Sequence, residues 1–263
     1  MAGHEVLVQQ VDPTSDRAVF RQIADHLRDA IQGGRLRTGE KLPSEAQLME
    51  HYHVARMTIR QAIQELKTEG LAVSEHGRGV FVRSRPNVKR LASDRFARRH
   101  RKEGKAAFLA ESETVGVKAS VDRIEVREVP APDDIAECLR VRPGEVVVSR
   151  SRRYSMDGTP VEVATSYIPV ELARGTRIMD DNPGPGGIYA RIEEQGRQLE
   201  RFVEDVSTRM PTREEARLLL LGPGIPVFRL VRTAYDLEGR AVEVCDTIMS
   251  GDAYQLSYEL PAH

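Results

Sequence analysis

Two arginines, Arg56 and Arg60, stand one helical turn apart in the segment ARMTIRQAIQELKTEG, residues 55–70. Apolar residues recur in the same segment at three- and four-residue spacing, which predicts an amphipathic helix with the arginines on a face beside the apolar stripe. A guanidinium group is a planar fork of donors that can bind a guanine edge or a phosphate through two hydrogen bonds. A solvated surface helix could carry the same residues, so the neighbouring elements have to decide between the two interpretations.

Two helices are predicted on the N-terminal side of this segment. Apolar spacing favours one over residues 17–32, with a Gly-Gly pair at its end. A short second helix is predicted over residues 44–51, because Ser44 stands three residues before Gln47 in the arrangement of a capping box. In that arrangement each side chain accepts a hydrogen bond from the backbone N–H of the other residue, which fixes the start of the helix.

A tight turn and a hairpin complete the pattern. The turn at His53 and Val54 leads directly into the arginine-bearing helix, which Gly70 ends. Two short β-prone runs, LAVSE and VFVR, flank the turn HGRG and predict a hairpin with Arg78 at its tip. A short capped helix that turns sharply into the next is the helix-turn-helix arrangement, whose last helix enters the major groove by its N-terminal end. These elements favour a DNA-binding surface that includes the arginines and the hairpin tip.

Charge is unevenly distributed along the 263 residues of the chain. Residues 1–105 hold 20 Lys and Arg against 13 Asp and Glu, whereas residues 106–263 hold 19 against 27. A net charge of +7 in the first part and −8 in the second indicates a polyanionic partner for the first part only. Residues 83–105 alone carry 10 Lys and Arg and two acids, and we interpret them as a linker whose charge also attracts phosphates.

The segment EKLPSEAQLMEHYHVARMTIRQAIQELKTEGLAVSEHGRGVFV resembles the winged helix of the GntR family of bacterial transcription factors nearly end to end. The resemblance covers about residues 17–83 and implies that the recognition helix and the wing contact operator DNA. Ala46 departs from many members, which carry an arginine there that touches the operator. The residues expected at DNA-contacting positions are Ser44, Ala55, Arg56, Met57, Thr58, Arg60, Gln61, His76, Gly77 and Arg78.

The C-terminal half contains an internal repeat with an offset of 81 residues, in which 129–169 corresponds to 209–250. Each copy has the pattern of a strand, a short helix, a long strand, a turn and a return strand. Two such copies usually pair into a single sheet and leave a cleft at their junction. The insert between them is predicted to form a helix over about residues 188–195. The coinciding residues are Pro130 with Pro211, Tyr154 with Tyr235, Gly158 with Gly239, and Glu162 with Glu243.

This half resembles the ligand-sensing UTRA domain of the HutC branch of the same family, over about residues 90–260. The DG-x-P turn and the SYIP strand end carry most of the resemblance. It implies a mixed α/β domain with an antiparallel sheet, related to chorismate lyase.

Effector-binding residues are expected on a strand whose alternation places Arg150, Arg152 and Tyr154 on one face. By comparison with sugar-phosphate-sensing relatives, Arg152 matches one ligand-binding arginine, Tyr154 replaces a second, and Glu243 matches an acidic ligand contact. The serine-bearing loop that grips phosphate in those relatives appears here as Gly-Pro-Gly-Gly, residues 184–187. These departures argue against a phosphosugar, and ion pairing on the sheet face is the alternative interpretation of the two arginines.

An enzyme is an alternative from another class, because the C-terminal fold that the resemblance implies is related to a lyase. Five of the seven histidines lie in the first 80 residues and none lies between residues 101 and 262, which argues against general-base histidine chemistry in that half. Cys138 and Cys245 are far apart, show no metal-ligand spacing and are interpreted as buried apolar residues in a reducing cytosol. We therefore expect no enzymatic activity, no metal site and no cofactor.

The sequence thus predicts an α+β protein with a winged helix-turn-helix domain at 1–83, a basic linker at 84–105 and a UTRA domain for effector binding and dimerisation at 106–263. We expect a cytoplasmic repressor that binds a palindromic operator as a homodimer and releases it when a small molecule binds. No apolar run approaches the ~20 residues of a membrane span, and no secretory signal is visible. An architectural DNA-binding protein, whose C-terminal domain only dimerises, is the third interpretation.

Overall fold

The computed structural model describes residues 9–75, 77–83, 88–91 and 118–259. The chain divides into two compact units, Met1–Arg85 with Gly222–Ile225 and Pro86–Leu221 with Pro226–His263. We call them the N-terminal and the C-terminal unit. No helix in the described ranges is long and apolar enough to cross a bilayer.

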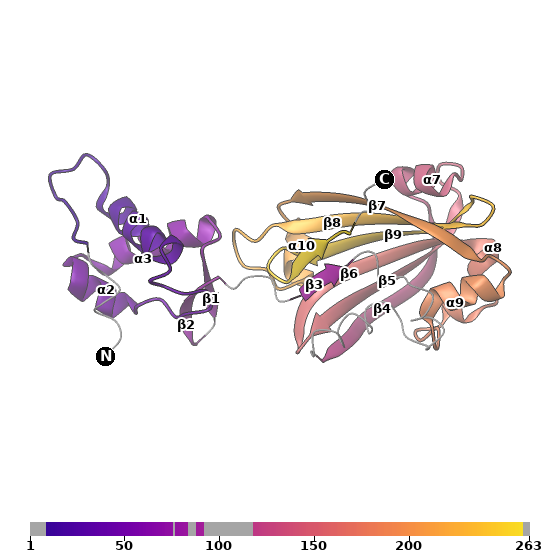
Figure 1. The fold of residues 1–263 in the computed structure, drawn as a ribbon, viewed down its shortest axis with the longest axis horizontal. Coiled ribbons are helices and arrows are strands. Elements are labelled where there is room, and N and C mark those ends of the chain that lie inside the picture. The colour runs from indigo at the N-terminus through magenta and orange to yellow at the C-terminus, as the bar shows by residue number, and fades with distance from the viewer. Residues whose placement is uncertain (1–8, 76, 84–87, 92–117, 260–263) are drawn as a thin grey trace. The chain divides into compact units, whose positions relative to one another are not determined.

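The described part of the N-terminal unit consists of helices followed by a hairpin (Figure 1). Helix α1 (Val19–Gln32) precedes the pair α2 (Glu45–Tyr52) and α3 (Arg56–Thr68). Strand β1 (Ala72–Glu75) then pairs antiparallel with β2 (Gly79–Val82). This order confirms the predicted winged helix-turn-helix.

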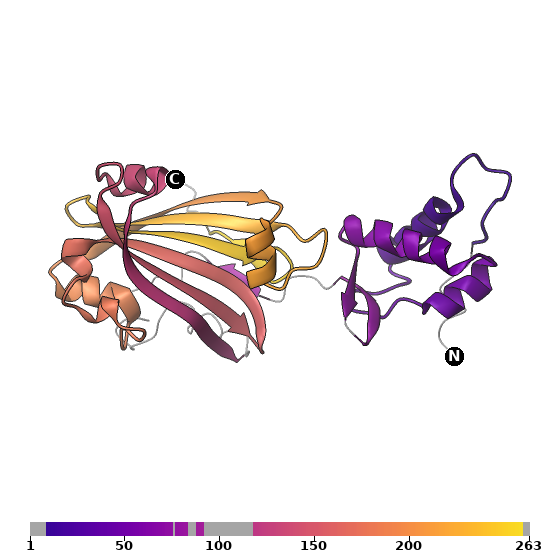
Figure 2. The ribbon, with the colours of Figure 1, turned by 180° about the vertical axis from the view of Figure 1, so that it is seen from behind.

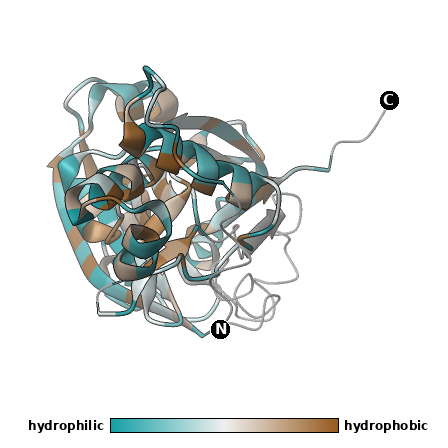
Figure 3. Ribbon diagram, turned by 90° about the vertical axis from the view of Figure 1, so that its left-hand side faces the viewer, coloured by the Kyte–Doolittle hydropathy of each residue, from teal (hydrophilic) through white to brown (hydrophobic). Residues whose placement is uncertain are grey.

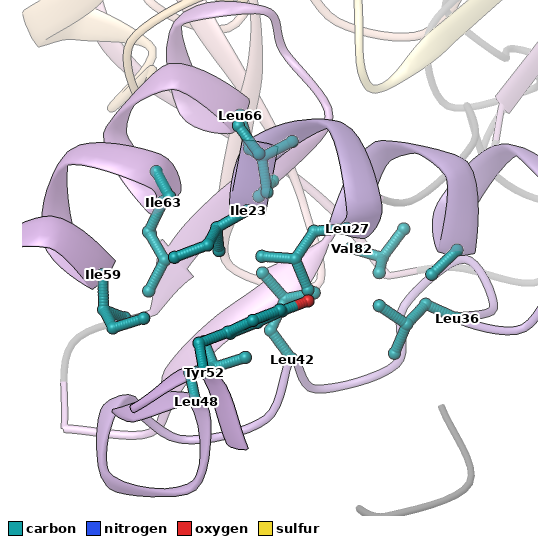
Figure 4. Packing of buried hydrophobic residues seen from close by; sticks show 14 residues of the cluster. Ile23, Leu27, Leu36, Leu42, Leu48, Tyr52, Ile59, Ile63, Leu66 and Val82 are labelled. Atoms are coloured by element: carbon teal, nitrogen blue, oxygen red, sulfur yellow. The ribbon is translucent and has the colours of Figure 1, made fainter. Parts of the chain in front are cut away.

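The core of this unit forms where the apolar sides of the helices meet. The helices carry both hydrophobic and hydrophilic residues along their length, as Figure 3 shows, and most of the hydrophobic ones face the core. In Figure 4 the side chains of α1 and α3 converge with Val82 of the hairpin, and the ring of Tyr52 from α2 lies among them. Burying this many aliphatic side chains, each worth about 1.5–3 kcal/mol, fixes the rotation of α3 about its axis. The buried residues include Ile23, Leu27, Leu36, Leu42, Leu48, Ile59, Ile63, Leu66 and Val82.

Local signals set the helix ends in this unit. The capping box is present as predicted: the Ser44 hydroxyl accepts a hydrogen bond from the Gln47 N–H, and Gln47 Oε1 accepts one from the Ser44 N–H at 2.9 Å. His53 adopts a left-handed conformation with φ 55°, which turns the chain sharply between α2 and α3. Gly70 follows α3 at φ 76°, a region that glycine enters without a steric penalty.

The C-terminal unit is built on one antiparallel sheet with the strand order β4-β5-β6-β9-β8-β7 (Figures 1 and 2). The sheet confirms the predicted pairing of the two repeat copies, since each copy supplies three adjacent strands and the copies meet at β6 and β9. The strands are β4 (Ala119–Pro130), β5 (Val146–Met156), β6 (Thr159–Pro169), β7 (Leu199–Arg209), β8 (Val227–Asp236) and β9 (Ala241–Ser250).

Helices cover both faces of this sheet. The repeat-related helices α7 (Asp133–Leu139) and α10 (Arg213–Leu218) belong to one face, where Ile135 of α7 shares a hydrophobic cluster with Val147 and Val244 of the sheet. The insert between the copies covers the other face with α8 (Val170–Ala173), the 3-10 turn η1 (Arg177–Met179) and α9 (Gly187–Glu194). The observed α9 confirms the helix predicted in the insert.

A short parallel pair adds to the C-terminal unit. Strand β3 (Val88–Leu91) pairs in register with β10 (Tyr254–Ser257). No pattern in the sequence predicts β3, which lies in the range 84–105 expected to be a linker. A parallel pairing between segments so far apart in the chain leaves no local signal, because the partner strand supplies its hydrogen bonds. The other residues of that range lie outside the described ones.

Candidate nucleic-acid interface and effector site

The N-terminal end of α3 presents two exposed arginines on a helix whose opposite side is packed. The side chains of Arg56 and Arg60 are 61% and 56% exposed. Ile59 and Ile63, between and after them in the chain, are buried in the core. A helix that buries one stripe must turn the neighbouring face to solvent, so both guanidinium groups are accessible to a partner.

Glu45, the first residue of α2, contacts both of these arginines. Its Oε1 accepts a hydrogen bond from Nε of Arg60 at 3.0 Å, and its Oε2 lies 3.7 Å from Nε of Arg56. The Ser44 capping box holds the backbone at this point. No sequence pattern points to Glu45, because the contact joins two helices and residues 15 positions apart.

The hairpin tip carries the third exposed arginine of the predicted surface. Arg78 forms an ion pair with Glu75, and its Cζ lies 5.2 Å from the centre of the Phe81 ring. Gly77 and Gly79 take φ values of 71° and 122°, which let the chain reverse between β1 and β2. His76, also predicted to contact DNA, lies outside the described residues.

The other residues predicted to contact DNA lie around the start of α2 and α3. Ser44 and Ala55 are the residues at which these helices are capped, and both are exposed. Met57 and Gln61 are exposed on α3, while Thr58 is half-buried. All the described members of the predicted set therefore lie at the helix starts, on the first two turns of α3 or in the wing.

In the C-terminal unit, Arg152 connects several polar side chains on the face that the insert covers. Its Nε donates to the hydroxyl of Tyr154 at 2.7 Å. Its Nη1 donates to the backbone carbonyl of Arg150 and to Oγ of Ser166, both at 2.9 Å. The Ser166 hydroxyl in turn donates to Oε1 of Glu243 at 2.7 Å, so Ser166 joins Arg152, with its partner Tyr154, to Glu243.

Glu243 is fully buried and is held by α9 as well as by the sheet. The hydroxyl of Tyr189 donates to its Oε2 at 2.7 Å and accepts a hydrogen bond from Nε of Arg232 at 3.0 Å. A terminal nitrogen of Arg232 lies 3.7 Å from the same carboxylate oxygen. We call the connected residues the buried polar network: Arg152, Tyr154, Ser166, Tyr189, Arg232 and Glu243.

Arg150 lies on the same sheet face, but its guanidinium group donates hydrogen bonds to the backbone of a loop. It donates to the backbone carbonyls of Ile178 at 3.3 Å and of Asp180 and Asp181 at 2.5 Å each. Burial lowers the pKa of Arg150, and the neighbouring charge of Arg152 acts in the same direction. These bonds tie β5 to the loop that leads from η1 into the predicted Gly-Pro-Gly-Gly stretch.

Burial controls protonation inside the network. It raises the pKa of Tyr189 well above its ordinary value, so the hydroxyl remains a hydrogen-bond donor to Glu243 at neutral pH. Burial acts against the charge of Arg232, yet Tyr189 and Glu243 raise its pKa further, so the guanidinium stays charged. Within the described ranges, no group of three His, Cys, Asp or Glu side chains could hold a metal ion.

Sequence reasoning missed Ser166, Tyr189 and Arg232 as members of this network. Arg232 could have been found, because alternation along β8 places it on the same face as Leu230 and Ala234, which are buried. Tyr189 gave no comparable signal, since it lies on the insert and reaches Glu243 across 54 positions of sequence.

Two family models match the chain. The model described as bacterial regulatory proteins, gntR family, matches residues 20–82, and the model of the UTRA domain matches residues 114–255. The two matches fall on the helix-turn-helix with its wing and on the sheet that carries the buried polar network.

Similar proteins cover nearly the whole chain. An uncharacterized HTH-type transcriptional regulator of Streptomyces coelicolor is 31% identical over 91% of both chains. The HTH-type transcriptional repressor NagR of Bacillus subtilis is 26% identical over 93% of this chain and 95% of its own. The crystal structure of PhnF from Mycobacterium smegmatis superposes with a TM-score of 0.57 at 26% identity, covering 94% of this chain and all of that one.

Proposed function

Because this chain belongs to the GntR family of bacterial regulatory proteins and carries the UTRA domain of its HutC branch, we propose that it is a repressor released from DNA by a small-molecule effector. The chain is a DNA-binding transcriptional regulator with a ligand-sensing domain, and its relatives are regulators and not enzymes. The proposal adds that it binds a palindromic operator as a homodimer, in the cytoplasm. Two half-sites related by a two-fold axis would each receive one α3.

The observation that carries the DNA-binding part is the pair of exposed arginines at the start of a helix packed on its other side. In the helix-turn-helix, this end of the last helix enters the major groove. Arg60 would bind a guanine edge with two donors, and Arg56 would bind a base or a phosphate. The wing would place Arg78 against the backbone or the adjacent minor groove. Ser44, Ala55, Met57, Thr58, Gln61, His76 and Gly77 complete the proposed contact set.

The effector is proposed to bind at the buried polar network, through Arg152, Tyr154 and Glu243. An arginine beside a carboxylate on one sheet face suits a polar ligand that carries both an acidic or hydroxyl group and a donor. Arg150 is proposed to act on the ligand indirectly, by holding the loop 178–181 in place. The absence of a hydroxyl from the sequence Gly-Pro-Gly-Gly still argues against a phosphosugar.

Repression, rather than activation, is supported by relatives. NagR of Bacillus subtilis, PhnF of Mycobacterium smegmatis and MngR of Escherichia coli are all described as repressors. A ligand releases DNA only if it favours a state of the protein that binds the operator less well.

The proposal is tested in two steps with the full chain. First, a library of metabolites is screened for compounds that raise the melting temperature, because a ligand that binds only the folded protein stabilises it by mass action. Each compound that does so is then titrated against the complex with double-stranded DNA recovered by the protein from a random library. Release of that DNA supports an effector-responsive regulator. Stabilisation without release would contradict the proposed mechanism, and no stabilising compound would favour the architectural, purely dimerising alternative.

A further inference from the structure

Glu45 lies between the two helices of the helix-turn-helix. It is the first residue of α2, where a carboxylate is also favoured by the positive end of the helix dipole. Its two oxygens are divided between the two arginines of α3, 3.0 Å from Nε of Arg60 and 3.7 Å from Nε of Arg56. One acidic side chain thus bridges the residues proposed to read the operator.

The contacts leave the base-reading ends of the arginines available. A guanidinium group has five N–H donors in a fixed fork, and Nε carries one of them. The four donors on the terminal nitrogens are not used in the contacts with Glu45. A guanine edge needs two parallel donors, which the terminal nitrogens supply. The hydrogen bond at Nε of Arg60 and the ion pair at Nε of Arg56 therefore restrict the rotamers of both side chains without blocking a bidentate contact.

We propose that Glu45 is a positioning residue that sets the sequence specificity of DNA binding by holding Arg56 and Arg60 in their base-reading conformations. Long arginine side chains lose rotamer freedom when they bind, and a partner that restricts them beforehand reduces that loss. The same carboxylate repels phosphates, so it disfavours binding to DNA whose bases offer no compensating contact. The inference rests on the proposed base contact of Arg60.

Two substitutions of Glu45 distinguish its positioning of the arginines from the effect of its negative charge. Glu45→Asp keeps the charge but shortens the side chain, so one carboxylate no longer spans both arginines. Glu45→Gln keeps the length and removes the charge. Glu50→Gln is the matched control, because Glu50 is an exposed acid on the same helix. Dissociation constants are measured for the DNA sequence recovered from a random library by the wild-type protein and for a scrambled sequence of the same composition. The specificity ratio is the scrambled constant divided by the selected one.

We expect Glu45→Asp to lower the specificity ratio about three- to tenfold with unchanged affinity for scrambled DNA. Glu45→Gln should lower the ratio by a similar factor while binding scrambled DNA more tightly, and Glu50→Gln should keep the wild-type ratio. A fraction of unfolded protein would raise both apparent dissociation constants by the same factor and would leave their ratio unchanged. A wild-type ratio for Glu45→Asp would overturn the positioning role, even if the Gln variant bound all DNA more tightly.

A double-mutant cycle shows whether Glu45 acts through Arg60. In the Arg60→Ala background, Glu45→Asp should lower the ratio much less than in the wild type, because Glu45 then has only Arg56 left to position. An equal loss in both backgrounds would exclude Arg60 as the residue that Glu45 positions. If Arg60→Ala alone weakens selected and scrambled DNA equally, the proposed base contact fails, and that outcome is distinct from failure of the inference on Glu45.

Discussion

Arg56 and Arg60 keep more than half of their side-chain surface exposed, whereas Arg150 and Arg232 are buried. The exposed arginines both contact the Glu45 carboxylate at Nε, and such surface pairs contribute little to folding stability. The buried ones are surrounded by fixed acceptors, because a buried charge without partners is strongly unfavourable. The first two arginines are therefore accessible to a binding partner, whereas the two buried ones connect the sheet to the segments that cover it.

Replacing Arg60 tests base recognition at the residue scale. If Arg60 grips a guanine with two hydrogen bonds, Arg60→Ala should cost about 1–3 kcal/mol of binding to the selected DNA and relax the preference at one position of the site. The measurement is the affinity for a set of sites that vary one base pair at a time. Lys67→Ala, at the other end of α3, is the control. Equal losses on selected and random DNA would show that Arg60 contacts only phosphate.

His26 of α1 predicts a pH dependence of stability. Its Nδ1 is buried without a hydrogen-bond partner among the described residues, and burial lowers the pKa of the ring below its ordinary value despite the opposing effect of Asp25 and Asp29. The folded protein therefore binds this proton less well than the unfolded chain does. The contribution to stability is complete above the unfolded pKa of about 6.5 and is lost as the pH falls below it toward the folded value.

The free energy of unfolding should accordingly fall between pH 7.5 and pH 5, and His26→Gln should reduce that fall. Urea unfolding at both pH values measures it. His53→Asn is the control, because His53 is exposed and asparagine tolerates its left-handed backbone conformation. A pH dependence identical in His26→Gln and the wild type would assign the effect to other groups.

At the scale of elements, the same local motif, a capping box, starts a helix in each of the two units, but the two helices have different roles. A capping box starts α2 through Ser44 and Gln47, and another starts α10 through Thr212 and Glu215. In the N-terminal unit the capped helix carries Glu45 to the arginines of α3. In the C-terminal unit the capped helix leads into Leu219 and Leu221, which pack on the sheet face opposite the buried polar network. The function of each device depends on what its helix packs against.

The basic segment between the units gives a prediction that rests on the sequence alone. Replacing Arg98, Arg99 and Arg101 with Gln should weaken specific and non-specific DNA binding alike, because phosphate attraction is independent of sequence. The slope of log K against log salt concentration should fall in magnitude by about 0.9 for each phosphate that the variant no longer neutralises.

The control for this segment removes the same charge elsewhere. Arg123, Arg142 and Arg213 are exposed in the C-terminal unit, and their triple Gln variant should keep a slope close to that of the wild type. An unchanged slope in the basic-segment variant would mean that these arginines face solvent in the complex and act only as part of a linker.

At the scale of the whole molecule, the proposed effector would bind in the C-terminal unit and change the DNA affinity of the N-terminal unit. The coupling free energy between such sites is typically about 1–3 kcal/mol, which corresponds to a shift in affinity of about 5–150-fold. The proposed effector residues lie on a sheet that includes strands from both repeat copies, so a ligand at this site would contact both copies at once.

Replacing Arg152 tests this coupling. Arg152→Ala should leave the affinity for selected DNA close to wild type and shift the effector concentration needed for release to the right by several-fold to a hundredfold, giving a super-repressor. Arg153→Ala is the control, because Arg153 lies on the opposite sheet face and pairs with Asp122. Tyr154→Phe, which removes only a hydroxyl, provides a second variant if the loss of Arg152 lowers stability. Release at the wild-type concentration by both variants would place the effector site elsewhere.

The sequence by itself determined the winged helix-turn-helix and the repeat of the sheet unit. These features rest on apolar periodicity, a capping box, turn residues and a fixed offset, all of which act between residues close in the chain or are repeated in it. Alternation along one strand placed Arg150, Arg152 and Tyr154 on a common face, whereas Glu243 became an effector candidate only through the resemblance to sugar-phosphate-sensing relatives.

Only the tertiary structure showed which distant side chains meet. It joined Glu45 to Arg60, Ser166 to Glu243 across 77 positions, and β3 to β10. It also showed that Arg150 donates its hydrogen bonds to loop carbonyls. Alternation along a strand predicts only the face on which Arg150 lies and not its partners. The physical reason is that a polar contact between packed elements depends on where the cores fix those elements, and no short stretch of sequence contains both the donor and its acceptor.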